Sequence, residues 1–277
     1  MTQGSANEAV RVAAIQVSCG ADLDANFRTV DALLADAARR DVRLALLPEN
    51  SVFIGANDAD KLVLAEAPGA GPIHEFLADA ARRHGLWLIA GSVPLKAPLA
   101  GKCYGGSLAY DDNGVLRAKY RKIHLFDVDL PDRDERYRES ATMDAGNDPV
   151  TVDTPAGRLG LTICYDLRFP ELYRRLVDAG ATVFSIPAAF TAVTGQAHWQ
   201  SLLRARAIEN LAYVIAAGQY GEHPNGRRTH GHSMIVDPWG EVLAMQETGD
   251  GVVDALLDPH RPATLRKEFP VLDSRKF

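Results

Sequence analysis

Hydrophobic residues in the first third of the chain follow the strand and helix spacings in turn. Apolar positions at helical spacing alternate with short apolar runs, and Pro and Gly mark several of the boundaries between them. The pattern predicts strands over 11–18, 43–47 and 86–92, and helices over 24–40 and from Pro72 to just before Gly85. The elements form repeated β-α-β units, so we expect helices that cover a partly parallel sheet.

The rest of the chain adds hairpins to this alternation. The stretches 104–110 and 115–120 flank Asp111-Asp112-Asn113-Gly114, a strong turn signal. Further strands are predicted over 159–163, 181–186 and 213–218, helices from Pro170 to before Gly180 and over 198–211, and a second hairpin over 233–236 and 241–245. Hairpins imply mixed sheets, and the similar element order of the two halves indicates two sheets packed together.

Composition narrows the class of protein. The 277 residues are 47% hydrophobic and carry a formal net charge of −6, which favours a small-molecule partner over nucleic acid. Without a linker or a composition shift, we expect one domain over 1–277, with a core over about 11–258 and a tail over 259–277. No apolar run is long enough to span a membrane, and the amino terminus has no leader pattern. Three cysteines without a CxxC pair indicate a reducing cytoplasm.

Cys164 is the first candidate for chemistry. It lies between a predicted buried strand and the helix that Pro170 opens, and such a strand-to-helix turn aims helix-terminal amides at the side chain. A nucleophilic thiolate benefits from this environment. The alternative is that Cys164 is a small buried hydrophobic residue, as most free cysteines are.

Two further residues follow predicted strands in the same way. Glu49 comes after Pro48 at the end of a strand, and Lys122 ends another in the segment Arg121-Lys122-Ile123-His124. Each taken alone fits a solvated charged side chain. Together with Cys164 they supply a base, a cation and a nucleophile, which acyl transfer requires.

In this order, the segments around Glu49, Lys122 and Cys164 resemble the nitrilase superfamily of carbon–nitrogen hydrolases, from about residue 11 to the carboxyl terminus. The resemblance implies a four-layer α-β-β-α sandwich of two mixed sheets, a Cys-Glu-Lys triad, and no metal or cofactor. It makes Glu49 the general base. Lys122 and the backbone amide of Tyr165 would stabilise the oxyanion.

Other site residues come from the same resemblance. Glu139 matches a second glutamate that holds the lysine, although the sequence after it departs from the family's Pro-Gly. Arg168 matches a carboxylate-binding arginine of related carbamoylases, and a structural ion pair with Asp166 or Glu171 is the alternative. Phe190 and Thr191 would line the acyl pocket, while His198 and Trp199 would begin the next helix.

The remaining sequence motifs do not indicate a further functional site. His230-Gly231-His232 supplies two potential zinc ligands but no third, so we predict no metal site there. There is no GxSxG motif and no dinucleotide fingerprint, and Cys19 and Cys103 are expected to be packing residues.

These features predict an amidohydrolase that converts a linear amide of a small carboxylate-bearing substrate to an acid and ammonia through a cysteine thioester. The segments 187–199 and 202–210 resemble the branch that holds the deaminated-glutathione amidases and the ω-amidases, and 205–209 and 232–240 are closer to the former. The alternatives are ω-amidase action on α-ketoglutaramate-like acids, a true nitrilase, a catalytically silent binding module, and a thiol-redox protein. The family further implies a homodimer or a higher homo-oligomer.

Overall fold

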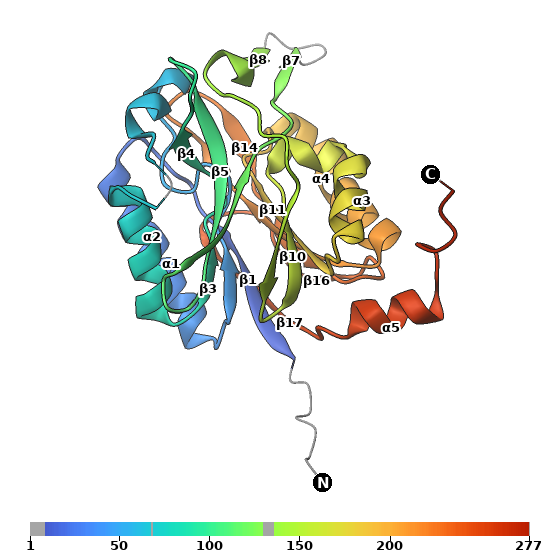
Figure 1. Ribbon diagram of the computed structural model, residues 1–277. Helices are drawn as coiled ribbons and strands as arrows, with labels where there is room; N and C mark the ends of the chain where they lie inside the picture. Colours follow the sequence, from blue (N-terminus) through green and yellow to red (C-terminus); the bar gives the residue numbers. More distant parts are fainter. Residues whose placement is uncertain (1–8, 68, 130–135, 277) are drawn as a thin grey trace.

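Two β-sheets pack face to face at the centre of the molecule, and helices cover their outer faces (Figure 1). The computed structural model describes residues 9–67, 69–129 and 136–276. The helices α1 and α2 lie on the outer side of one sheet, and α3 and α4 lie on the outer side of the other. This is the predicted α-β-β-α order of layers.

The first sheet has seven strands in the order β17-β1-β2-β3-β5-β4, with β6 also paired to β5. Their bounds are β1 (Val10–Gln16), β2 (Leu44–Leu46), β3 (Trp87–Ile89), β4 (Val93–Lys96), β5 (Cys103–Tyr110), β6 (Leu116–Arg121) and β17 (Gly251–Leu257). The central strands β1, β2 and β3 are parallel, and the outer pairings are antiparallel. The sheet is therefore mixed, as predicted from the alternation of β-α-β units with a hairpin.

The second sheet has six strands in the order β16-β15-β12-β11-β10-β9. Their bounds are β9 (Val150–Thr154), β10 (Gly157–Leu161), β11 (Val183–Ala188), β12 (Tyr213–Gly218), β15 (Ser233–Val236) and β16 (Val242–Gln246). Here too the three central strands, β10, β11 and β12, are parallel. The carboxyl ends of parallel strands are where α/β folds place their sites.

Five α-helices lie in the described part of the chain, and some of their ends have clear capping residues. The helices are α1 (Leu23–Arg39), α2 (Pro72–His84), α3 (Pro170–Asp178), α4 (Ala192–Asn210) and α5 (Arg261–Glu268). The Asp22 side chain caps α1 by accepting from the Ala25 amide, and Gly85 ends α2 in the left-handed conformation. The pairs β7 (Asp127–Asp129) with β8 (Arg136–Arg138) and β13 (Tyr220–Glu222) with β14 (Arg228–His230) complete the described strands, and the short 3-10 helices are η1 (Asp58–Leu64), η2 (Glu139–Ala141) and η3 (Cys164–Arg168).

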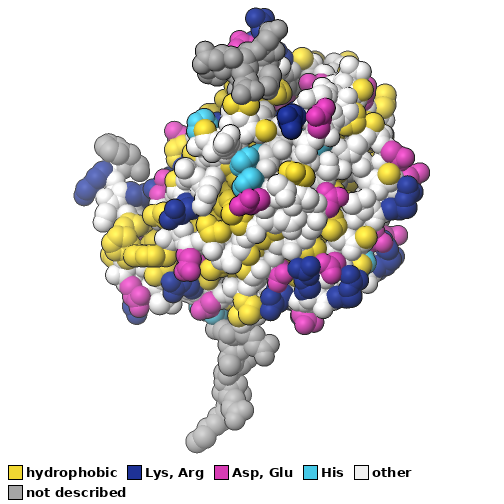
Figure 2. All heavy atoms as spheres, turned by 180° about the vertical axis from the view of Figure 1, so that it is seen from behind, with side chains coloured by type: hydrophobic (Ala, Val, Ile, Leu, Met, Phe, Trp, Pro, Cys, Tyr) yellow, Lys and Arg dark blue, Asp and Glu magenta, His cyan; other side chains and the backbone are white. Residues whose placement is uncertain are grey.

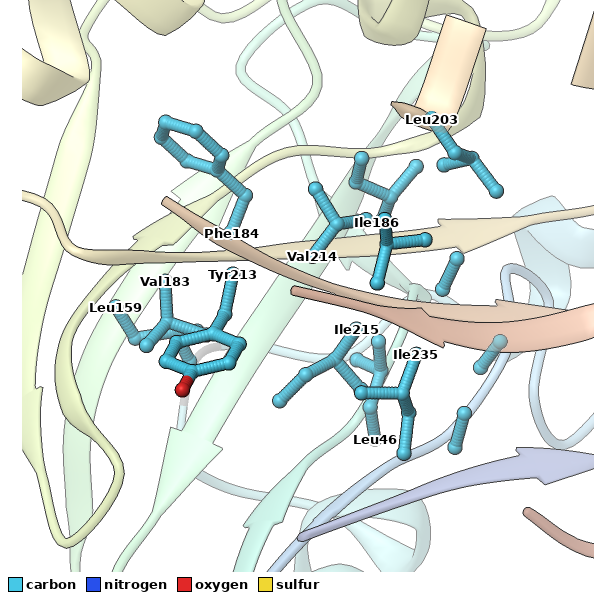
Figure 3. Packing of buried hydrophobic residues seen from close by; sticks show 14 of the residues in the cluster. Leu46, Leu159, Val183, Phe184, Ile186, Leu203, Tyr213, Val214, Ile215 and Ile235 are labelled. Carbon is cyan, nitrogen blue, oxygen red and sulfur yellow. The ribbon is translucent and has the colours of Figure 1, made fainter. Parts of the chain in front are cut away.

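Alternation along the strands builds the core. In β12, Val214 points to one face of the sheet, and Tyr213 and Ile215 point to the other (Figure 3). Ile215 and Ile235 face Leu46 of the first sheet, so their side chains fill the space between the sheets. Because both faces of the central strands are covered, these strands read as continuous apolar runs in the sequence.

The structure corrects one predicted boundary near the site. The helix expected over 198–211 begins at Ala192, so His198 and Trp199 lie inside α4 and do not begin it. Thr191 is the cap: its hydroxyl accepts from the Thr194 amide and contacts the Thr194 hydroxyl. Among the described residues, no helix is both long and apolar enough to cross a membrane.

Candidate active site

Cys164 lies where the sequence pattern predicts it, just after β10 and at the first residue of η3. Its side chain is buried, and its φ of 47° lies in the left-handed region that non-glycine residues seldom adopt. Such backbone conformations concentrate at functional sites. Tyr165 follows as the second residue of η3, so its amide is among those that have no acceptor inside the helix.

Asp166 fixes this turn to the segment that carries Lys122. Its side chain is fully buried and accepts hydrogen bonds from the Tyr120 hydroxyl at 2.7 Å, the Ile163 amide at 2.9 Å and the His124 amide at 3.1 Å. The His124 ring also contacts this carboxylate, at 2.7 Å from Nδ1. Asp166 thus joins the end of β6 to the start of η3, which brings Lys122 and Cys164 into one place.

Lys122 sits between two carboxylates. Its Nζ donates to Oε1 of Glu49 at 2.7 Å and to Oε1 and Oε2 of Glu139 at 2.8 and 2.9 Å. Burial alone would lower the pKa of Lys122, but the charges of Glu139 and Glu49 outweigh it and raise the pKa well above its usual value. Lys122 is therefore a buried ammonium ion whose charge is fixed by its neighbours.

Glu49 is held from both sheets. It follows β2, and its Oε2 accepts from the Ala189 amide at 2.8 Å, at the end of β11. The Gln219 side chain, just after β12, donates to the backbone carbonyl of Glu49 at 3.0 Å. Burial works to raise the pKa of this carboxyl group, but Lys122 and Arg227 lower it to about 2, so Glu49 is ionised.

The Cys164 thiol and the Glu49 carboxylate line the same cavity and influence each other's ionisation. Burial raises the pKa of Cys164 well above its usual value, and the Glu49 charge raises it further. The resting state is therefore a neutral thiol beside an ionised carboxylate. This arrangement can transfer a proton from sulfur to Glu49 as the sulfur attacks a substrate.

One cavity is lined by all four predicted catalytic residues, Glu49, Lys122, Glu139 and Cys164. Glu139 is in η2, and its Oε2 also accepts from the Phe126 amide at 2.6 Å. That bond orients the carboxylate that holds Lys122. The departure of the sequence from the family pattern beyond Glu139 leaves this contact intact.

A smaller pocket opens on another side of Cys164. It is lined by Phe126, Cys164, Tyr165, Arg168, Phe190, Thr191, Thr194 and Arg227, so it includes all four predicted substrate-binding residues. The Arg168 guanidinium lies over the Phe190 ring, 5.1 Å from its centroid, and 3.3 Å from Nδ1 of His198. Within the described part of the chain it forms no ion pair with Asp166 or Glu171. The Asp166 carboxylate is taken by the groups named above.

The two histidines of the segment His230-Gly231-His232 contact each other. The rings of His230 and His232 stack at 3.9 Å, and Nδ1 of His232 lies 2.9 Å from the His230 carbonyl. Across residues 9–67, 69–129 and 136–276, no group of three His, Cys, Asp or Glu side chains is placed to hold a metal ion. Cys19 and Cys103 are buried and line none of the cavities described here.

Sequence reasoning missed Arg227. In the sequence it is one of two adjacent arginines, Arg227 and Arg228, yet it lines both the catalytic cavity and the smaller pocket. It donates to the Ala189 carbonyl, beside the amide that binds Glu49. Nothing in the local pattern distinguishes Arg227 from Arg228; only the fold brings it to Cys164.

The chain is similar to known proteins over nearly its whole length. The carbon–nitrogen hydrolase family model matches residues 11–267. A deaminated glutathione amidase from Synechocystis is 45% identical over 268 residues, which cover 96% of this chain and 97% of that protein. The human deaminated glutathione amidase is 41% identical and is covered to 82%. The crystal structure of the Caenorhabditis elegans NitFhit protein superposes with a TM-score of 0.90 at 41% identity, over 98% of this chain and 66% of that longer one. The chain belongs to the carbon–nitrogen hydrolase family.

Proposed function

We propose that this enzyme hydrolyses deaminated glutathione. The observation that carries the proposal is the buried cluster of Glu49, Lys122, Glu139 and Cys164 around one cavity, in a chain 40–45% identical over nearly its whole length to proteins named deaminated glutathione amidase. Glutathione is γ-glutamyl-cysteinyl-glycine. Its deaminated form keeps the γ-amide and carries a keto group in place of the amine, and it bears a carboxylate at each end.

The first half-reaction forms a thioester. The Cys164 sulfur attacks the amide carbon while its proton moves to Glu49. The carbonyl oxygen becomes an oxyanion, which the Lys122 ammonium and the Tyr165 amide stabilise. Collapse of the tetrahedral intermediate breaks the carbon–nitrogen bond, and Glu49 returns the proton to the departing nitrogen.

The second half-reaction restores the enzyme. Glu49 takes a proton from a water molecule, whose oxygen attacks the thioester carbon. The carbon–sulfur bond then breaks, and the proton returns to the Cys164 sulfur. The product is a carboxylic acid, and Lys122 stabilises the second oxyanion as it did the first.

The leaving group depends on the amide. A primary amide releases ammonia, the product expected from the sequence, whereas the γ-amide nitrogen of deaminated glutathione belongs to cysteinylglycine. Glu49, the proton donor to this nitrogen, lines the larger cavity and not the smaller pocket. We therefore assign the amine to the larger cavity and the carbonyl end of the acyl chain to the smaller pocket, which has a volume of only about 10 Å³.

A groove outside the larger cavity has room for a dipeptide. It has a volume of about 800 Å³ and shares Asn57, Asp58, Tyr137, Asn225 and Arg227 with the cavity. Ammonia needs no such space. The continuity of cavity and groove thus supports a bulky amine as the leaving group.

The test uses the free amine that cleavage creates. Deaminated glutathione has no primary amine, so hydrolysis yields one amine and one molecule of 2-oxoglutarate for each bond broken. Purified enzyme should release the two in equal amounts. In a parallel assay, faster ammonia release from α-ketoglutaramate would favour ω-amidase action instead, and inactivity toward both would contradict the proposal.

We also propose that residues 1–277 act as one domain in a cytoplasmic homodimer. Leu272 of the tail packs against the core of its own subunit, and Arg275 pairs with Asp178 of α3. Trp239 and Phe269 remain about half exposed with their rings 5.7 Å apart, and apolar side chains lie among charged ones on the face seen in Figure 2. Sedimentation velocity tests the dimer, and a single folded mass at the monomer value would contradict it.

A further inference from the structure

Arg227 occupies the junction of three hollows. It lies directly before β14 and lines the catalytic cavity, the smaller pocket beside Cys164 and the outer groove. Of the residues lining these hollows, it is the one that the three share. A charged side chain at this position borders the space on both sides of Cys164.

The other cations around the catalytic cavity and the outer groove already have carboxylate partners. Lys122 has Glu49 and Glu139; Lys61 has Asp58, Arg138 and Arg136 have Asp129, and Arg228 has Glu222, all within 4.0 Å. In the described part of the chain, no carboxylate lies that close to the Arg227 guanidinium. Arg227 is thus the cation of these two hollows whose charge is left uncompensated at close range.

The contacts of Arg227 leave donors unused. One terminal nitrogen donates to the Ala189 carbonyl, and the guanidinium lies over the Tyr137 ring, 5.2 Å from its centroid. Its Nε is buried and has no hydrogen-bond partner among the described residues. A buried donor of a charged group is costly unless it is paired, so this nitrogen is available to a bound anion.

We propose that Arg227 binds a carboxylate on the acyl part of the substrate and so selects amides with an anionic acyl group. This inference rests on the amidase function proposed above. A guanidinium presents several donors in a planar fork that matches a carboxylate. Phe126 and Phe190 form apolar walls of the smaller pocket, where the low dielectric strengthens such a pair.

A positioning role is the competing explanation. Arg227 holds the Ala189 carbonyl, and the Ala189 amide holds Glu49, so loss of the arginine could slow every substrate equally by displacing the base. The two explanations differ in one measurable respect. A carboxylate-binding arginine affects anionic ligands selectively, whereas a positioning arginine affects charged and uncharged acyl chains alike.

The test measures protection of Cys164 from alkylation by iodoacetamide, followed by mass spectrometry of the Cys164 peptide. The probes are glutarate and pentanoate, which have equal chain lengths and differ only in the distal carboxylate. Glutarate should protect the wild-type protein at lower concentrations than pentanoate. In Arg227→Gln, the protecting concentration of glutarate should rise about 10- to 100-fold, the range for a hydrogen bond to a charged group, with little change for pentanoate.

Arg174→Gln is the matched control. Arg174 of α3 also donates to a backbone carbonyl, that of Glu209, but it lines none of the three hollows. Its protection profile should equal that of the wild type. Equal protection of the wild type by glutarate and pentanoate, or an equal shift for both probes in Arg227→Gln, would overturn the inference.

Two further measurements keep the outcome interpretable. Arg227→Lys retains the charge without the fork and should fall between wild type and Arg227→Gln, which still decides the matter if the latter variant does not fold. Turnover of deaminated glutathione by the wild type is assayed separately. If the wild type did not turn over deaminated glutathione, the proposed function would be wrong. The comparison of glutarate with pentanoate would still test whether Arg227 binds a carboxylate.

Discussion

The carboxylate of Glu49 accepts a hydrogen bond at 2.8 Å from the backbone amide of Ala189, which lies 140 residues further along the chain, directly after β11 of the other sheet. Each sheet therefore contributes half of the support for the proposed base: β2 carries its backbone, and the end of β11 orients its side chain. A change in how the two sheets pack would move Glu49 relative to Cys164. The packing of the core therefore determines the position of the proposed base relative to the nucleophile.

Cys164→Ala should abolish turnover, with a loss of about 10³-fold or more because the covalent route disappears. Release of amine from deaminated glutathione is the measurement. Cys103→Ala is the control, since Cys103 is also buried but lines no part of the cavity. Unchanged turnover in Cys164→Ala would contradict the assignment of the nucleophile.

Lys122→Met should destabilise the protein by about 3–5 kcal/mol, because it leaves two carboxylates around a buried site without their cation. Urea unfolding measures this free energy. Glu139→Gln should cost less, since Lys122 keeps Glu49 as a partner. An equal or smaller loss in Lys122→Met than in Glu139→Gln would show that the ammonium does not hold the cluster together.

The pKa of Glu49 predicts the acid limb of the activity profile. Its folded-state pKa of about 2 lies below the usual 4.5, so the ionised base persists, and its contribution to stability is complete above about pH 4.5 and is lost as the pH falls toward 2. We expect kcat/KM to remain level on the acid side down to about pH 4.5. An inflection near pH 6 in kcat/KM, with the protein still folded, would contradict this assignment of the base.

Gly91→Ala should disturb the proposed base through the backbone. Gly91 has a φ of 34°, and an added Cβ would lie 1.9 Å from the Pro48 carbonyl oxygen, next to Glu49. Gly101→Ala is the control: its φ of 75° imposes a similar backbone penalty, of about 1 kcal/mol, but nothing lies within 4 Å of the new Cβ. Gly91→Ala should lower both the melting temperature and kcat well beyond this control. Equal effects would mean that the close approach does not constrain Glu49.

Tyr120→Phe tests the link through Asp166. It removes the 2.7 Å hydrogen bond that the Tyr120 hydroxyl donates to the fully buried Asp166 carboxylate. We expect the free energy of unfolding to fall by about 1–3 kcal/mol. The same change should lower kcat more than it raises KM, because η3 loses one anchor to the lysine segment. Thermal melting and steady-state kinetics check the two effects, and an unaltered melting temperature would contradict the first.

Local pattern was sufficient for most of the fold. The apolar runs predicted the central strands, and the turn residues predicted the two hairpins. Both signals lie within the element itself and need no knowledge of the rest of the fold. The start of α4 escaped prediction because Ala192 to Ala197 includes a glycine and has no clear apolar face; its helix depends on the Thr191 cap and on packing over β14. Tertiary context decided that boundary.

The predicted catalytic residues stood out through their combination, since Glu49 and Lys122 each taken alone fit a solvated charged side chain. The resemblance implied that Glu139 holds Lys122, but the local pattern did not indicate the bond between Lys122 and Glu49, which depends on how β2 and β6 lie in the same sheet. Arg227 gave no signal at all. Its neighbour Arg228 has the same side chain but is exposed at the start of β14. Only the turn before β14 brings Arg227, and not Arg228, near Cys164.

Because Cys164 borders both the larger cavity and the smaller pocket, the two products of the proposed reaction leave from different sides of Cys164 and at different times. Once the amine has left, the acyl group stays bound to the Cys164 sulfur as a thioester. Water then reaches the thioester through the larger cavity, which the amine has left. The order of events follows: a new amide cannot be cleaved until the first acyl group has gone, and an excess of the released amine should compete with water for the same place.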